Sequence, residues 1–171
     1  LQSSSAASDV YKRQIKFYAR LDEQELYNTM MERVRNYAYL MRLDKPIGTL
    51  LLLWPTLCAL LLASDASVDM KTIWLFCLGA FFARSMGCVI NDFFDKDIDS
   101  KVLRTSQRPI ASGKVSSIEA LILFGFLSIP SVWILFQLNE LSIYMGLGAA
   151  LLILLYPLAK RFLAIPQTIL G

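Results

Sequence analysis

Histidine is absent from this sequence of 171 residues, and cysteine is rare. Without histidine, these residues can form neither a Ser-His or Cys-His catalytic pair nor a histidine-based metal site. Cys58, Cys77 and Cys88 all lie inside apolar segments. Their spacing fits neither a metal site nor a disulfide framework, so we interpret them as small hydrophobic side chains.

Charge is also scarce, because only 18% of the residues are charged while 56% are hydrophobic. Soluble domains contain about 25% charged residues. The apolar residues gather into four blocks, at 47–63, about 73–90, about 118–138 and about 141–158. Each block has roughly the 17 to 25 residues that a membrane-spanning helix needs. The sequence therefore predicts an all-α, polytopic transmembrane helix bundle with four membrane helices in this chain.

Basic residues flank these blocks unevenly. Flanking segments that would lie on one side of the membrane contain eleven basic residues: Arg33, Arg35, Arg42, Lys45, Lys96, Lys101, Arg104, Arg108, Lys114, Lys160 and Arg161. The loop after the first block contains only Lys71, and the Asn139–Glu140 turn contains no basic residue. Cytoplasmic loops are enriched in Lys and Arg. We therefore expect a multi-pass protein of the inner (cytoplasmic) membrane, with its N-terminus and the 91–114 loop on the cytoplasmic side.

The segment before the first block divides into two parts. We expect residues 1–14 to be a disordered or non-native tail. In residues 15–46, apolar side chains recur at helical spacing between charges, which predicts an amphipathic helix on the membrane surface. The recurring positions are Leu26, Met30, Val34, Tyr37 and Met41. Residues 47–171 form the predicted membrane domain, and a new apolar stretch near Gly171 suggests the first part of a longer protein.

An acidic stretch, NDFFDKDID, follows the second apolar block at residues 91–99. On a continuing helix, Asp92, Asp95 and Asp99 fall within about 60° of one another, with Asn91 about 40° to one side and Asp97 opposite. Mg²⁺ is often held by one or two carboxylates together with substrate phosphates. We expect Asn91, Asp92, Asp95 and Asp99 to hold Mg²⁺.

Other interpretations of the acidic stretch remain open. It could be a solvated loop or a charged vestibule for ion transport. A calcium loop is excluded, because Ser100 and Ser106 stand where that loop requires Gly and Glu.

Basic residues come directly after the acids. Lys101, Arg104 and Arg108 can pair with phosphate oxygens while a metal neutralises the same group. A prenyl diphosphate, with an anionic head and an apolar tail, would suit this loop at a membrane surface. Tyr156 and Lys160 lie four residues apart at the end of the fourth block and could meet the same phosphates. A snorkelling lysine beside an interfacial tyrosine is the simpler alternative.

These motifs resemble the UbiA-type intramembrane aromatic prenyltransferases. NDFFDKDID matches their N-D-x-x-D-x-x-x-D motif, and YPLAK matches their Y-x-x-x-K element. LMRLDKPIGTLLLLWPTL, GCVINDFFDKDID, RTSQRPIASGKVS and YPLAKRFLAIPQTILG resemble the branch that prenylates 4-hydroxybenzoate in ubiquinone biosynthesis. The resemblance covers about residues 38–171.

The resemblance implies nine membrane helices around a cavity and Mg²⁺-dependent transfer of a polyprenyl group from polyprenyl diphosphate to 4-hydroxybenzoate. Asp92, Asp95 and Asp99 would be catalytic metal–diphosphate residues together with Asn91. Arg42 is a candidate for the acceptor carboxylate, and Trp54 and Phe82 for the cavity wall. The family's second aspartate motif would lie beyond Gly171, so we expect this chain alone to be inactive.

Other functions compete with this expectation. A sister prenyltransferase could act on a naphthoate, homogentisate, haem or a glyceryl phosphate. A CDP-alcohol phosphotransferase is disfavoured, because Phe-Phe follows Asp92 where that class has D-G-x-x-A-R. A membrane transporter is the non-enzymatic alternative. A lipid bilayer is an expected partner, and nucleic acid is not.

Overall fold

The computed structural model describes residues 22–64 and 67–159, with side chains up to Tyr156. The chain divides into two units, residues 1–36 and residues 37–171. In the first unit, residues 22–36 are helical, and Leu26, Met30 and Val34 are exposed. The predicted tail at 1–14 lies outside the described residues. Binding of this segment to a membrane surface stays a prediction.

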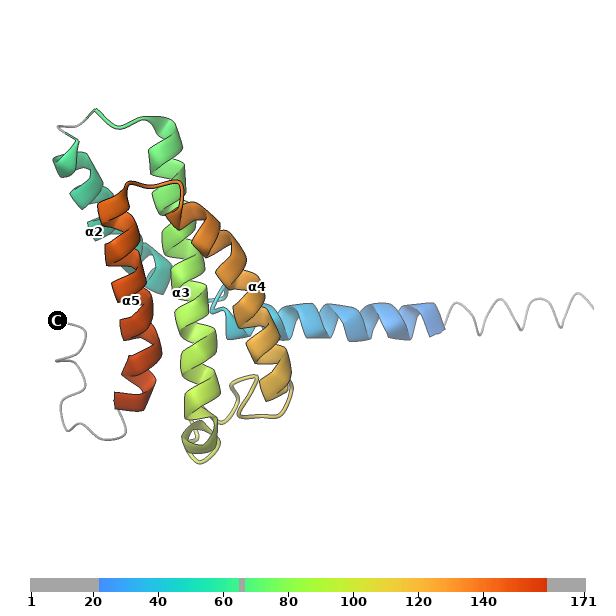
Figure 1. Cartoon of the computed structure of the whole chain (residues 1–171). Helices are drawn as coiled ribbons and strands as arrows, with labels where there is room; N and C mark the ends of the chain where they lie inside the picture. The colour runs from blue at the N-terminus through green and yellow to red at the C-terminus, as the bar shows by residue number, and fades with distance from the viewer. Residues whose placement is uncertain (1–21, 65–66, 160–171) are drawn as a thin grey trace, which may run out of the picture. The chain divides into compact units, whose positions relative to one another are not determined.

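The second unit contains four long helices and, among the described residues, no strand (Figure 1). They are α2 (Ile47–Ala63), α3 (Met70–Asp99), α4 (Ser117–Leu135) and α5 (Glu140–Ala159). Helix α3 packs against the three others, and α4 also contacts α5. The all-α prediction is therefore confirmed, and α3 forms the centre on which the site is built.

Two of the four predicted membrane helices, α3 and α4, are long and apolar enough to cross a bilayer. Helices α2 and α5 are apolar over shorter stretches, Ile47–Ala63 and Glu140–Tyr156. Prolines at 55 and 130 lie within α2 and α4 without ending them. The count of four spans stays a prediction.

Helix α3 continues from the apolar block through the acidic stretch, as expected. Its first turn is capped by Asp69, whose carboxylate accepts hydrogen bonds from the Thr72 backbone N–H (3.1 Å) and hydroxyl (2.6 Å). These bonds favour the carboxylate form and lower the pKa of Asp69 below its usual value. Helix α3 is 30 residues long. Its acidic stretch, residues 91–99, contains neither proline nor glycine. This length places the acidic side chains on the same helix that packs against α2, α4 and α5.

The loop after α3 is folded into hydrogen-bonded turns rather than extended. Its backbone N–H groups at Ser112 and Val115 donate to the carbonyls of Arg108 and Pro109. Gly113 has a φ of 75°, a left-handed conformation that glycine adopts without steric cost.

This loop is anchored by apolar side chains. Ile110 and Val115 are buried in a cluster with Val89 of α3. The remaining members of the cluster are Leu40, Ala120 and Leu127. Burial of an isoleucine or valine side chain such as these two contributes about 1.5–3 kcal/mol. The loop is therefore fixed against α3, which determines where Arg108 lies.

Helix α4 begins with a capping box that also reaches the chain before α2. The Ser116 side chain accepts from the Glu119 N–H, and Glu119 Oε2 accepts from the Ser116 N–H at 2.7 Å. The Tyr37 hydroxyl donates to Glu119 Oε1 at 3.4 Å. The segment that leads into α2 is thus linked to the start of α4.

Candidate active site at the end of α3

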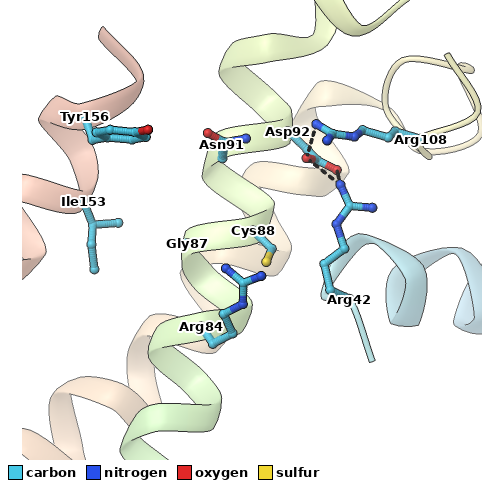
Figure 2. Close-up of a pocket in the computed structure, with 9 residues that line it drawn as sticks. All are labelled: Arg42, Arg84, Gly87, Cys88, Asn91, Asp92, Arg108, Ile153 and Tyr156. Atoms are coloured by element: carbon cyan, nitrogen blue, oxygen red, sulfur yellow. Dashed lines mark hydrogen bonds and ion pairs between the residues drawn. The ribbon is translucent and has the colours of Figure 1, made fainter. Parts of the chain in front are cut away.

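A pocket of about 350 Å³ lies beside the C-terminal half of α3 (Figure 2). Helix α3 contributes Arg84, Gly87, Cys88, Asn91 and Asp92. The remaining lining residues are Arg42 before α2, Arg108 in the loop, and Ile153 and Tyr156 on α5. Four segments that are distant in sequence therefore meet around one cavity. Three of its side chains are arginines, so the pocket suits an anionic ligand.

Asp92 connects two of these arginines. Only 2% of Asp92 is exposed. Arg42 Nη2 donates to both of its oxygens, at 2.9 and 2.8 Å, and Arg108 Nη1 donates to Oδ1 at 3.0 Å. A buried carboxylate requires such partners, because removal from water disfavours its charge. Asp92 thus holds both guanidinium groups against the pocket wall.

Asp99 holds Arg108 from a second direction. Arg108 Nη1 donates to Asp99 Oδ2 at 2.6 Å, while the Thr105 hydroxyl donates to the Asp99 backbone carbonyl at 3.1 Å. Arg108 therefore bridges two acidic side chains seven residues apart on α3. The expected face is confirmed, because Asp92, Asp95 and Asp99 are buried while Asp97 is exposed.

The four expected metal ligands do not form one cluster. Among residues 22–64 and 67–159, no three acidic, cysteine or histidine side chains are placed to hold a metal ion. Asp92 and Asp99 instead bind arginine, whereas Asn91 Nδ2 donates to Asp95 Oδ2 at 3.1 Å. The adjacent amide and carboxylate fit Mg²⁺ only as a partial ligand set, completed by water and phosphate oxygens.

The residues predicted to bind the two substrates separate into three groups. Arg108 and Arg42 line the pocket, and Tyr156 faces it from α5 (Figure 2). Lys101 and Arg104 are exposed and do not line it. Lys160 lies outside the described residues.

Two further expectations concerned the wall of the cavity. Trp54 is 65% exposed, and Phe82 packs against the buried cluster around Val89. Neither side chain lines the pocket. Aromatic residues in apolar segments are common, so their presence alone could not indicate which of them face a cavity.

Sequence reasoning missed four lining residues: Arg84, Gly87, Cys88 and Ile153. A signal was available for Arg84, because it is the one charged residue in the apolar block 73–90. Charged side chains within membrane segments are costly and usually mark functional positions. Arg84, Cys88 and Asp92 also follow each other at four-residue intervals, which places them on one face of α3.

Several known proteins are similar to this chain. The sequence matches the UbiA prenyltransferase family over residues 52–171. A 4-hydroxybenzoate octaprenyltransferase of Polynucleobacter asymbioticus is 48% identical over 84% of this chain and 50% of its own. Proteins of the same name from Vibrio cholerae and Neisseria meningitidis are 49% and 51% identical, over 81% and 85% of this chain and 49% of each relative. The chain thus spans about half the length of the curated relatives it matches.

A solved structure, described as a digeranylgeranylglyceryl phosphate synthase in membranes, is also similar. It has a TM-score of 0.71 and 27% sequence identity, over 82% of this chain and 49% of the solved one. The helical arrangement around the pocket is therefore shared with a membrane protein of known structure.

Proposed function

The chain belongs to the UbiA prenyltransferase family, and from this premise we propose that the complete protein prenylates 4-hydroxybenzoate in ubiquinone biosynthesis. It transfers a polyprenyl group from polyprenyl diphosphate to the aromatic ring. The observation on which this proposal depends is the arginine-rich pocket beside Asn91, Asp92 and Tyr156. The names of the relatives that are 48–51% identical support the acceptor.

We assign the metal to Asn91 and Asp95. The amide and carboxylate are adjacent on α3, and Mg²⁺ commonly binds few protein oxygens and completes its shell with phosphate and water. Bound Mg²⁺ would supply positive charge that stabilises a leaving diphosphate. Asp92 and Asp99 act differently in this proposal, because their hydrogen bonds position Arg42 and Arg108.

Arg108 and Tyr156 bind the diphosphate. The bonds from Arg108 to Asp92 and Asp99 both use Nη1, and a guanidinium has five N–H donors. The remaining donors can reach a phosphate oxygen at the pocket. Lys160 is a further candidate, since it follows Tyr156 by one helical turn in the sequence. The exposed Lys101 and Arg104 contribute less, through long-range attraction.

The reaction follows from this placement. The allylic C–O bond of the donor breaks, and the diphosphate leaves with the bonding electrons. Hydrogen bonds from Arg108 and Tyr156 stabilise the charge that grows on its oxygens. An electron pair of the phenol ring forms the new C–C bond at the carbon beside the hydroxyl group. The proton on that carbon passes to an oxygen of the released diphosphate, which restores the aromatic ring.

The protein is embedded in the inner membrane in this proposal, with the N-terminus and the 91–114 loop on the cytoplasmic side. The distribution of basic residues supports this orientation. The apolar tail of the donor lies on the bilayer side of the site. Fusing reporters that are active on only one side of the membrane to residues 66 and 114 tests the sidedness directly.

The test of the function uses the full-length protein in membranes with a polyprenyl diphosphate. We expect Mg²⁺-dependent formation of prenylated 4-hydroxybenzoate with release of one diphosphate per product, and no product after chelation. A dihydroxynaphthoate, homogentisate and a glyceryl phosphate are offered in parallel. Product from one of these but not from 4-hydroxybenzoate would identify a sister enzyme. Uptake of substrate without diphosphate release would identify a transporter.

A further inference from the structure

A tight turn joins the helical segment that ends at Leu40 to α2. Arg42 lies in this turn with a φ of 60°, and it is the one residue other than glycine with a positive φ in the described part of the chain. The left-handed conformation brings Cβ close to the following carbonyl oxygen in every residue except glycine. An arginine at this position therefore needs a compensating interaction.

The backbone hydrogen bonds of this turn are those that usually surround a glycine. The Leu43 N–H donates to the Ala38 carbonyl at 3.0 Å, and the Arg42 N–H donates to the Tyr39 carbonyl at 3.1 Å. These two bonds form the Schellman motif, in which a left-handed residue, most often glycine, follows the end of the helix. Leu40, two residues before Arg42, is completely buried in the apolar cluster. The turn is thus anchored to the core independently of the arginine side chain.

The Arg42 side chain supplies the compensating interaction. Its Nη2 donates to both oxygens of the buried Asp92, at 2.9 and 2.8 Å. Figure 2 shows Arg42 and Arg108 reaching this carboxylate from different segments of the chain. Hydrogen bonds between charged groups are roughly twice as strong as those between neutral groups. The cost of the backbone conformation at position 42 is therefore offset by a guanidinium that is fixed on α3.

Asp92 connects this turn to the loop after α3. Its Oδ1 accepts from both arginines, from Arg42 Nη2 at 2.9 Å and from Arg108 Nη1 at 3.0 Å. Rotation of the carboxylate would lengthen the bonds to both guanidinium groups together. The orientation of Asp92 that Arg42 imposes therefore also determines where Arg108 lies.

We propose that Arg42 is a positioning residue. Its left-handed turn directs the guanidinium onto Asp92, and the carboxylate fixed in this way holds Arg108 where the diphosphate of the donor binds. This inference rests on the function proposed above. In this role Arg42 does not bind the acceptor carboxylate predicted for it, because a substrate carboxylate would compete with Asp92 for Nη2.

The backbone part of the proposal is tested by comparing Arg42→Gly with Arg42→Ala in the full-length protein. Both variants lose the guanidinium, and they differ only by Cβ. In a left-handed turn, the glycine variant should unfold roughly 2 °C or more above the alanine variant. At a helical position the order would be reversed, because alanine favours a helix over glycine. The reversed order would overturn the proposal.

The positioning part is tested by the kinetics of the donor. Arg42→Gly should raise KM for the polyprenyl diphosphate about tenfold, as the loss of one charge-assisted hydrogen bond at Arg108 would. Arg35→Gly is the matched control, since Arg35 is exposed on the preceding helix. It should lower the unfolding temperature and leave this KM within twofold of the wild type. If KM instead follows the unfolding temperature in both variants, the role of Arg42 is only structural and the proposal fails.

A double-mutant cycle shows whether Arg42 acts through Asp92. Asp92→Asn should itself raise KM for the donor, and adding Arg42→Gly should change it by less than a further twofold. Effects that multiply would show that Arg42 contacts the donor directly, which contradicts a positioning role. If Asp92→Asn does not fold, Arg108→Gln takes its place in the cycle with the same expectation.

Binding of inorganic diphosphate distinguishes failure of this inference from failure of the proposed function. Calorimetry of the purified full-length protein with inorganic diphosphate and Mg²⁺ should show binding that Arg42→Gly weakens about tenfold and Arg35→Gly leaves unchanged. If the wild type transfers no prenyl group to 4-hydroxybenzoate, the proposed function fails, and this binding result still decides the role of Arg42. Equal binding by the wild type and Arg42→Gly refutes the inference alone.

Discussion

At the scale of single residues, Asp92 and Asp95 belong to one acidic motif but have different neighbours. Asp92 accepts hydrogen bonds from Arg42 and Arg108. Asp95 accepts from Asn91 on the preceding turn. Their spacing predicted one shared task, whereas their contacts differ, and for this reason we propose arginine positioning for Asp92 and metal binding for Asp95.

The division of roles predicts opposite outcomes for two matched substitutions. Asp95→Asn should raise the Mg²⁺ concentration for half-maximal activity at least tenfold, because a ligand charge is lost. Asp92→Asn should leave that requirement unchanged and lower stability by about 3 kcal/mol, because two partly buried arginines lose their partner. Mg²⁺ titration and thermal unfolding in detergent measure both. A Mg²⁺ requirement that rises equally in both variants would show that Asp92 is also a ligand.

At the scale of elements, the loop after α3 is a structural part of the site. Ile110 and Val115 enter the buried cluster, while Arg108 between α3 and these anchors faces Asp92. The positive charge of this loop was apparent in the sequence. Its folding into turns against α3 explains why Arg108 lines the pocket and Arg104 does not.

The turn at Gly113 tests this view of the loop. Gly113→Ala places a Cβ in a left-handed conformation at a φ of 75°, which costs roughly 1–2 kcal/mol. The unfolding temperature should fall, and KM for the diphosphate donor should rise because Arg108 loses its anchor. Gly125→Ala is the matched control, since open space surrounds Gly125 within α4. It should be neutral or stabilising by about 0.5–1 kcal/mol. Equal effects of the two substitutions would contradict the anchored loop.

At the scale of the whole chain, apolar side chains cover the outward faces of the helices. Leu62 is 82% exposed, Phe126 is 70% exposed and Tyr144 is 71% exposed. In water, a protein with such a surface would aggregate, whereas in a membrane lipid would cover the apolar side chains. This distribution agrees with the apolar spans of α3 and α4.

A charge in the middle of α4 provides the test at this scale. Phe126→Arg should reduce membrane insertion, because an arginine at the centre of a span costs about 2.5–3.5 kcal/mol. The amount of protein that resists alkaline extraction of membranes measures insertion. Gln137→Arg, just after α4, should insert like the wild type. Equal retention of both variants would indicate that α4 does not face lipid at Phe126.

The sequence by itself determined the helices, the acidic face of α3 and the family. Apolar blocks of bilayer length and a helical period in Asn91–Asp99 are local properties, so they can be read from the order of residues. This is why the bounds of α2 match the prediction, and why Asp97 faces away from the buried acids.

Only the tertiary structure decided which charges meet. The pairing of Arg42 with Asp92 spans 50 positions, and Tyr156 joins them from a fourth segment. Exclusion of Arg104 and inclusion of Arg84 likewise depend on how the loop and α2 pack on α3. Long-range contacts arise from the packing of whole elements against one another. The spacing of residues within one helix does not indicate which side chain of another segment will contact them.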